Sequence, residues 1–270
     1  MENNCARLRT EKLCFAYPKG ETVLHNLNIC VKRGKITALI GPNGCGKSTL
    51  FHLLTGRLKP VSGKVYIDSS ELRAIRRQEL AKKISAVCQH NAAPDDLTVK
   101  KLVRMGRTPY QKAFAFSGSV EDEDAVTRAM LFTDTQELAD RPLSQLSGGQ
   151  KQRVWLAMAL AQTTDTLLVD EFTNHLDIRY QLEMLHLTRE LNRQKGVTVL
   201  MVLHDVNQAL NFCDEIILMK QGRLLAQGSA GQVVTEAAIS SAFDVNVRII
   251  TIDGRKHCVF HKEDLPHGVH

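Results

Sequence analysis

The hydrophobic positions of the first ninety residues form short runs that are separated by turn residues. Pro18-Lys19-Gly20 and Arg33-Gly34 interrupt these runs. Apolar runs of this length between turn residues predict β-strands. The expected strands cover residues 13–17, 27–31, 35–40, 62–68 and 84–89. The run at 35–40 is continuously apolar, as expected of a buried strand, and we expect a helix from Gly46 to about residue 56.

The pattern changes twice after this point. From about residue 90 to 163 the strand patterns disappear and helical ones replace them, at 99–106, 121–132 and 151–162. After residue 165 strands and helices alternate again, and such alternation predicts a parallel sheet covered by helices. The expected elements are strands at 166–170, 197–204 and 215–220 and helices at 178–194 and 206–212.

The resulting fold class is α/β, with an antiparallel β part at the N-terminus, a parallel sheet and an inserted α-helical subdomain. The core domain is expected to cover residues 1–243, with the helical subdomain at about 90–163. Residues 244–270 form a hairpin-like extension that turns at Asp253-Gly254, a dipeptide typical of tight hairpin turns.

Amino-acid composition limits the kind of protein this chain can be, but it does not identify a ligand. Of the 270 residues, 43% are hydrophobic and 24% are charged, which excludes a disordered chain. The formal net charge of +6 suits an anionic ligand. No apolar run approaches the roughly 20 residues that span a bilayer, and the first residues lack the apolar core of a signal peptide. Seven cysteines without a CxxC favour a reducing compartment.

The first candidate for chemistry is a glycine-rich loop between the strand at 35–40 and the following helix. Its pattern, Gly-x4-Gly-Lys-Ser, is the P-loop, in which backbone N–H groups surround phosphate, a lysine adds charge and a serine hydroxyl can bind Mg²⁺. The loop therefore predicts nucleotide binding on a P-loop NTPase core. Its residues are Gly41, Pro42, Asn43, Gly44, Cys45, Gly46, Lys47, Ser48 and Thr49.

Polar residues at strand ends are candidate partners of this loop. Asp170 ends the strand at 166–170, where a carboxylate can hold Mg²⁺, and Glu171 follows it, placed to polarise an attacking water. His204 ends the strand at 197–204, at the edge of the parallel sheet where ligands bind in such folds. Taken alone, each of these residues could equally be structural.

A second glycine loop, residues 147–150, allows two interpretations. Ser147 and Gln150 have the spacing of a capping box, which only starts a helix. Gly148 and Gly149 weaken a first helical turn, which a capping box does not explain. Bare backbone at a helix N-terminus is useful where an anion approaches closely.

These motifs together resemble the ATP-binding subunits of ABC transporters. The matching stretches, in the family's order, are "GPNGCGKST", Gln89, "LSGGQ", "TLLVDE", "NHLD" and His204, and the resemblance covers nearly the whole chain. Tyr17 stands where the family has an aromatic side chain that stacks on adenine. Phe172 departs from the family, which usually has proline after the catalytic glutamate.

The resemblance implies a homodimer. In the family two subunits pair head to tail, and the "LSGGQ" of one covers ATP bound to the P-loop of the other. It implies that Lys47, Ser48, Thr49 and Asp170 hold phosphates and Mg²⁺. It gives Gln89 a contact with Mg²⁺ or water, Glu171 the role of catalytic base and His204 a contact with the γ-phosphate, and it places Asp177 in the loop that joins the two sites.

Finer similarity points to an importer. The stretches "LTVKKLVRMGRTPYQ", "MVLHDVNQAL" and "AFDVNVRI" are similar to ATPase subunits of bacterial importers for ferric siderophores, haem and cobalamin. We expect ferric siderophore import, with separate integral-membrane permease subunits, an indirect substrate-binding protein and a location on the cytoplasmic face of the cell membrane. Alternatives are a haem or cobalamin importer, a soluble iron–sulfur assembly ATPase and a small-molecule kinase. No nucleic-acid partner is expected.

Overall fold

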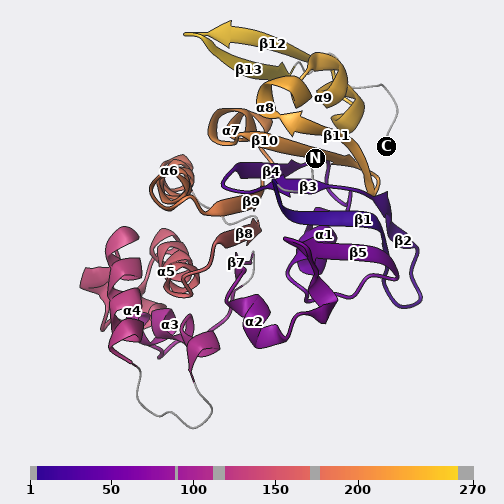
Figure 1. Cartoon of the computed structure of the whole chain (residues 1–270). Helices are drawn as coiled ribbons and strands as arrows, with labels where there is room; N and C mark the ends of the chain where they lie inside the picture. The colour runs from indigo at the N-terminus through magenta and orange to yellow at the C-terminus, as the bar shows by residue number, and fades with distance from the viewer. Residues whose placement is uncertain (1–4, 89–90, 112–118, 171–176, 261–270) are drawn as a thin grey trace. The chain divides into compact units, whose positions relative to one another are not determined.

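The computed structural model describes residues 5–88, 91–111, 119–170 and 177–260 (Figure 1). Gln89, Glu171 and Phe172 therefore lie outside the described residues. The chain divides into two compact units. The first unit comprises residues 1–74 and 198–270, and the second comprises residues 75–197.

The first unit contains a mainly parallel set of strands with β4 (Ile36–Ile40) inside it. In this unit the order is β11-β10-β4-β9. Strand β4 pairs in parallel with β10 (Glu215–Lys220) on one side and with β9 (Thr198–Val202) on the other, and β11 (Arg223–Ser229) is antiparallel to β10. All residues of β4 and β9 are buried. The expected parallel sheet is confirmed.

The long strand β1 (Ala6–Ala16) is the central strand of an antiparallel sheet. Strand β1 pairs with β2 (Thr22–Leu27), β3 (Cys30–Lys32) and β5 (Ser62–Ile67), and the short strand β6 (Ser70–Glu71) extends the sheet beside β5. A single strand at 27–31 is wrong, because β2 ends at Leu27 and β3 begins at Cys30. The Thr10 hydroxyl accepts from Ile29 N–H at 3.0 Å and donates to Leu27 O at 2.8 Å, so the two strands pair with different parts of β1.

Helices and a hairpin complete the first unit. The helices are the 3-10 turn η2 (Leu72–Ala74) and α1 (Lys47–Leu54), α7 (Val206–Phe212), α8 (Ala230–Val233) and α9 (Glu236–Phe243). The hairpin of β12 (Val247–Ile252) and β13 (Arg255–Phe260) turns at Asp253 and Gly254, whose φ angles are 50° and 74°. The expected turn is confirmed, whereas the pattern did not predict β2, β11, α8 or α9.

The second unit is mostly helical. Its elements are α2 (Arg77–Ala81), β7 (Ser85–Val87), α3 (Val99–Met105), η3 (Thr108–Tyr110), α4 (Val120–Phe132), η4 (Gln136–Leu138), η5 (Leu143–Gln145), α5 (Gly148–Ala161), β8 (Thr166–Asp170) and α6 (Ile178–Lys195). Strands β7 and β8 pair in parallel. Among the residues described between 91 and 163 there is no strand, only one isolated bridge between Thr98 and Pro142, as the helical pattern predicts.

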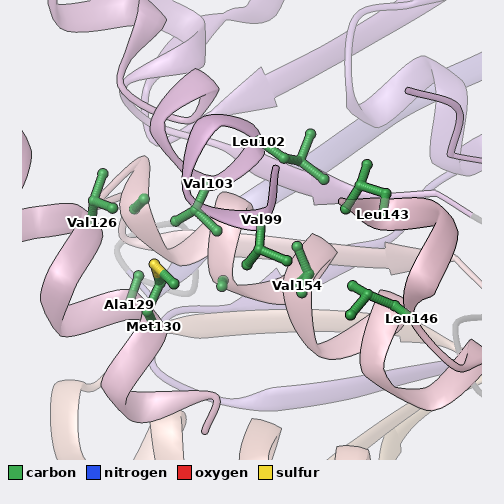
Figure 2. Packing of buried hydrophobic residues seen from close by; sticks show 11 residues of the cluster. Val99, Leu102, Val103, Val126, Ala129, Met130, Leu143, Leu146 and Val154 are labelled. Carbon is green, nitrogen blue, oxygen red and sulfur yellow. The ribbon is translucent and has the colours of Figure 1, made fainter. Parts of the chain in front are cut away.

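Three helices of this unit, α3, α4 and α5, share one hydrophobic core (Figure 2). Every member of this helical core is at most 7% exposed. The members are Val99, Leu102, Val103, Val126, Ala129, Met130, Leu143, Leu146, Val154, Ala157 and Ala161. Because Leu146 directly precedes the second glycine loop and Val154 lies one turn after it, this core fixes the start of α5.

Candidate functional site

The P-loop, residues 41–49, connects β4 to α1 in the first unit. Gly46 is the N-cap of α1 and has φ 99°, a left-handed conformation that favours glycine. A Cβ atom at this position would lie 2.7 Å from Leu24 Cδ2. At the other end of the loop, a Cβ atom on Gly41 would lie 2.2 Å from the carbonyl oxygen of Met219. Both glycines are therefore required by the backbone and by the neighbouring strands.

Lys47 is the charged group of this loop. Its side chain is buried, with 5% exposed, and its ammonium donates to Gly41 O at 2.8 Å and to Pro42 O at 3.0 Å. The loop thus wraps around its own lysine, while Asn43 and Gly44 at its tip are exposed and a Cβ on Gly44 would meet nothing within 4 Å. A curled loop with an internal ammonium and the start of a helix fits the binding of phosphate.

The remaining residues of the P-loop differ in accessibility. Cys45 is 3% exposed, and burial raises the pKa of its thiol, although the charge of Lys47 opposes this. Ser48 is half-buried in the first turn of α1. The Thr49 hydroxyl lies 3.2 Å from the Tyr17 hydroxyl, and the Tyr17 ring is 45% exposed. An exposed ring beside the P-loop helix can stack on a flat ligand group.

His204 belongs to the same unit as the P-loop. Strand β9 ends at Val202, so His204 is two residues beyond the strand rather than its last residue. Leu203 N–H donates to Leu39 O at 3.2 Å, which holds this segment against the end of β4. Because β4 and β9 are parallel neighbours, the P-loop and the exposed His204 follow the same edge of the sheet.

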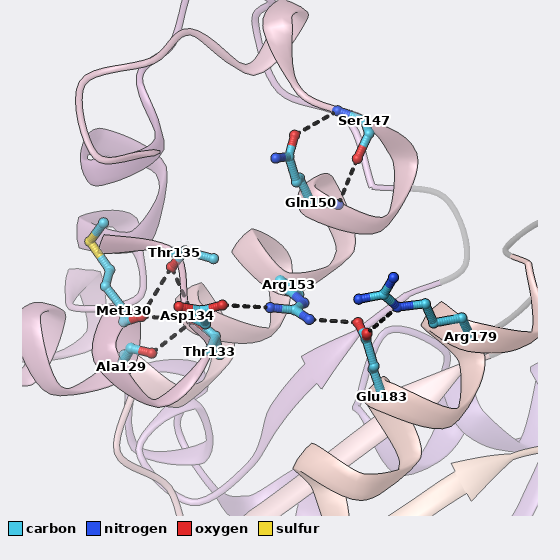
Figure 3. Close-up of polar contacts among 10 residues, drawn as sticks. All are labelled: Ala129, Met130, Thr133, Asp134, Thr135, Ser147, Gln150, Arg153, Arg179 and Glu183. Atoms are coloured by element: carbon cyan, nitrogen blue, oxygen red, sulfur yellow. Dashed lines mark hydrogen bonds and ion pairs between the residues drawn. The ribbon is translucent and has the colours of Figure 1, made fainter. Parts of the chain in front are cut away.

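The second glycine loop starts helix α5 in the second unit. Ser147 is its N-cap, and the capping box is complete: Gln150 N–H donates to the Ser147 hydroxyl at 3.3 Å and Ser147 N–H donates to Gln150 Oε1 at 3.0 Å (Figure 3). Gly148 is exposed and Gly149 is buried. The capping interpretation of Ser147 and Gln150 is confirmed, and it leaves the exposed backbone at Gly148 accessible to an anion.

The carboxylates of the second unit occupy two kinds of position. Asp170 is 3% exposed at the end of β8. Asp177 is the exposed N-cap of α6, and its carboxylate accepts from Tyr180 N–H at 3.0 Å. Among the described residues no three His, Cys, Asp or Glu side chains gather as a metal site. Hydroxyl and carboxylate oxygens such as those of Ser48 and Asp170 are the ligand type that Mg²⁺ prefers, and Mg²⁺ in nucleotide sites needs only one or two of them besides phosphate.

The sequence matches the family model described as ABC transporter over residues 24–174, more than half of the chain. The chain belongs to the ABC transporter family. It is an ATPase whose domain binds nucleotide. It is 43% identical to the ferric enterobactin transport ATP-binding protein of Escherichia coli K12, over 93% of this chain and 92% of that protein. It is 41% identical to the iron(3+)-hydroxamate import ATP-binding protein of Bacillus subtilis 168, over 90% of each.

Solved structures agree with this assignment. An ABC transporter assigned to the metal-chelate type, in an inward-facing conformation, has a TM-score of 0.83 at 28% identity, covering 96% of this chain and 98% of that chain. An ATP-binding cassette in a dimeric post-hydrolysis state, bound to ADP and Pi, has a TM-score of 0.72 at 30% identity, covering 83% of this chain and 98% of that chain. The chain therefore has the fold of an ABC ATPase cassette.

In the part of the chain that the structure describes, no helix combines the length and the apolar character needed to cross a membrane.

Sequence reasoning missed several residues that join segments far apart in the chain. In the first unit, Asn207 donates to Cys258 O at 3.1 Å and accepts from Cys258 N–H at 2.8 Å, which ties the C-terminal hairpin to α7. In the second unit, Tyr180 and Arg153 lie beside the second glycine loop. No sequence motif predicts such residues, because their partners are far away in the sequence.

Proposed function

We propose that this chain is the ATP-hydrolysing subunit of a bacterial ABC importer that takes up a ferric siderophore through a separate permease. The observation that carries the proposal is the presence of two glycine-rich loops that each begin a helix, one in each unit. The P-loop has its buried Lys47, and the second glycine loop has a capped helix start with exposed Gly148. The relatives that act on ferric enterobactin and iron(3+)-hydroxamate support the choice of cargo.

The P-loop is the proposed nucleotide site. Backbone N–H groups of the loop, to which Pro42 contributes none, would surround the phosphates, Lys47 would supply positive charge, and the Tyr17 ring would stack on adenine. The hydroxyls of Ser48 and Thr49 lie in the first turn of α1, where the helix dipole adds to the attraction for phosphate.

Hydrolysis depends on residues of both units. Ser48 and Asp170 are the proposed ligands of Mg²⁺, with Gln89 in contact with the ion or a water. When bound, Mg²⁺ would neutralise negative charge on the phosphates. Glu171 accepts a proton from the attacking water as general base, and His204 contacts the γ-phosphate. Gln89 and Glu171 lie outside the described residues, so their roles rest on the family pattern.

The complete site is proposed to need two copies of the chain. Each P-loop is covered by residues 147–150 of the other copy, with Asp177 between the two sites. A dimeric cassette with ADP and Pi among the similar structures supports this arrangement. The dimer is proposed to bind permease subunits at the cytoplasmic face of the cell membrane. A substrate-binding protein on the other side of the membrane would act on the dimer only indirectly, through the permease.

The proposed docking surface for the permease, residues 90–115, is partly used by the chain itself. Val99, Leu102 and Val103 are members of the helical core. Lys100 and Arg104 are exposed, but both pair with Glu123, at 3.1 and 2.8 Å. Charge reversal at either position therefore also breaks an ion pair within the chain. The half-exposed Met105 is a better position for testing contact with a permease.

The mixing of two inactive variants tests the sharing of loops. A Lys47→Ala chain is mixed with a Ser147→Arg chain, so that each hybrid dimer has one site with both loops intact and one with neither. We expect ATPase activity in the mixture above that of either variant alone. No gain despite proven hybrid formation would contradict the sharing of loops between copies.

Transport is tested in proteoliposomes that contain the chain with its permease. We expect ATP hydrolysis to rise on addition of the receptor loaded with ferric siderophore, and to be lost in the Lys47→Ala chain. A response to haem or cobalamin instead would replace the proposed cargo. Failure to bind any permease would favour the soluble iron–sulfur assembly ATPase.

A further inference from the structure

The second glycine loop contacts helix α6 at one particular point. A Cβ atom on Gly149 would lie 2.7 Å from Tyr180 Cδ1 and 2.9 Å from Cε1 and Cγ of the same ring. Real Cβ atoms do not approach other atoms so closely, so the ring occupies the place of a side chain at position 149. Gly149 lies within α5 and is not among the residues with positive φ. Its lack of a side chain is needed for packing, not for backbone conformation.

The Tyr180 ring is itself held in place by the start of α6. Tyr180 lies in the first turn of this 18-residue helix, and its N–H donates to the Asp177 carboxylate. The residue that caps α6 and the ring that covers Gly149 are therefore parts of one helical turn. Any shift of this turn moves the ring against the backbone of the second glycine loop.

Ion pairs join the same two helices about one turn further along (Figure 3). The Arg153 guanidinium on α5 lies 2.5 Å from Glu183 on α6 and 3.1 Å from Asp134, which follows α4. Arg179 lies 3.0 Å from the other oxygen of Glu183. Hydrogen bonds from Arg153 and then Arg179 hold the pKa of Glu183 below its usual value, so this carboxylate is charged at neutral pH.

We propose that Tyr180 is a positioning residue for the second glycine loop, acting through the backbone of Gly149, with the Arg153–Glu183 ion pair fixing the spacing of α5 and α6. The second glycine loop and Asp177 then form one rigid assembly. This inference rests on the proposed function, in which both contribute to ATP hydrolysis. It also assigns the absence of a side chain at 149 to contact with the Tyr180 ring.

The proposal is tested by adding a side chain at position 149 and removing the ring at position 180. Gly149→Ala adds a methyl group that the ring excludes, and Gly149→Ala/Tyr180→Ala removes the ring from its path. We expect Gly149→Ala to lower the kcat for ATP hydrolysis by roughly 10²-fold, the cost of a displacement of about 1 Å. The double variant should have a kcat about tenfold higher than that of Gly149→Ala, since residues in contact are energetically coupled. The KM for ATP should remain unchanged, because the P-loop is intact.

The matched control is Gly149→Ala/Tyr180→Phe, which keeps the ring and removes only the hydroxyl. We expect no recovery in this variant. Thermal unfolding of all four chains, including Tyr180→Ala alone, accompanies the kinetics. If Tyr180→Ala does not fold, Tyr180→Val serves in its place, since it lacks Cδ1, the ring atom nearest to position 149, and Cε1.

Two outcomes would overturn the inference. One is equal loss of hydrolysis in Gly149→Ala and the double variant, both folded, which would show that the Tyr180 ring does not cause the loss. The other is full activity of Gly149→Ala. The failure of the proposed function is a different result: the unaltered chain would then show no ATP hydrolysis that depends on Lys47.

Discussion

The P-loop and the second glycine loop both begin a helix, but their glycines satisfy different requirements. Gly46 has a left-handed φ of 99° and provides no side-chain cap to α1. Gly149 is helical, and the capping of α5 is done by Ser147 and Gln150. At Gly46 both the left-handed φ and the neighbouring Leu24 side chain require glycine, whereas at 149, where φ is not positive, the requirement comes from a ring on another helix.

This difference determines what supports each loop. Lys47 donates to carbonyls of its own loop, so much of the P-loop geometry is local. The second glycine loop depends on the helical core beneath α5, on Tyr180 and on Arg153. Substitutions far from residues 147–150 are therefore expected to affect the second loop, while the P-loop should respond to changes within itself and at its neighbour Leu24.

The largest expected effect concerns Glu171, the proposed general base. Glu171→Gln should lower hydrolysis by roughly 10² to 10⁴-fold through loss of the general base, while ATP binding is kept. ATP should then hold the chain as a stable dimer in gel filtration, and adding Lys47→Ala should abolish this dimer. A Glu171→Gln chain with more than half of the original activity would exclude the base role.

The second largest effect is expected from a substitution that destabilises only the second unit, and with it the second glycine loop, while the P-loop stays intact. Arg107 and Asp122 are buried and form an ion pair of 2.7 Å, and Arg107 also donates to Ala161 O. Arg107→Met leaves the Asp122 carboxylate buried without this partner, at a cost of about 3–5 kcal/mol. Amide exchange should show loss of protection in α4 and α5, with ATP binding at the P-loop retained.

The pH dependence of this variant has a definite sign. Burial raises the pKa of Asp122, but hydrogen bonds from Arg107 and Ser119 outweigh it and hold the pKa below its usual value. The stabilisation is therefore present at neutral pH and is lost as the pH falls through the lowered pKa. The difference in unfolding free energy between the chains should shrink in acid. Glu79→Gln, which breaks an exposed pair with Lys82, is the control and should cost at most about 1 kcal/mol.

A smaller effect tests whether the cap of the second glycine loop has a role beyond helix stability. Ser147→Ala should cost about 1 kcal/mol through loss of the N-cap. The matched control is Ser119→Ala, because Ser119 forms the same capping box at the start of α4. Both variants should lose similar stability in denaturant titrations, but only Ser147→Ala should reduce ATP hydrolysis. Equal hydrolysis in the two variants would leave Ser147 with a capping role alone.

The smallest effect is expected inside the P-loop, at Cys45. The thiol is buried and its pKa is raised by burial, so it should stay protonated and resist alkylation in the folded chain. Exposed Cys5 should react first. Labelling is followed by mass spectrometry. Rapid labelling of Cys45 in the native chain would show that the interior of the P-loop opens easily, contrary to this prediction.

Element prediction succeeded where the pattern was strong and local. The continuous apolar runs at β4, β8 and β10, the helices α4 to α6 and the Asp253-Gly254 turn could all be predicted. The strand at 27–31 was wrong because a single side chain, Thr10, takes the hydrogen bonds that would have continued it. Strand β2 and helices α8 and α9 were missed because they are short, at six, four and eight residues, so each offers too few repeats of a hydrophobic period.

The sequence by itself determined the family, the two glycine loops and the capping box, because each depends on residues that are close along the chain. It could not determine why position 149 is glycine, or that Lys100 and Arg104 share one partner. Those depend on atoms brought together from distant segments, such as Tyr180 against Gly149 and Glu123 against α3. Only the tertiary structure decides such contacts, because packing and ion pairing act through space and leave no spacing along the chain.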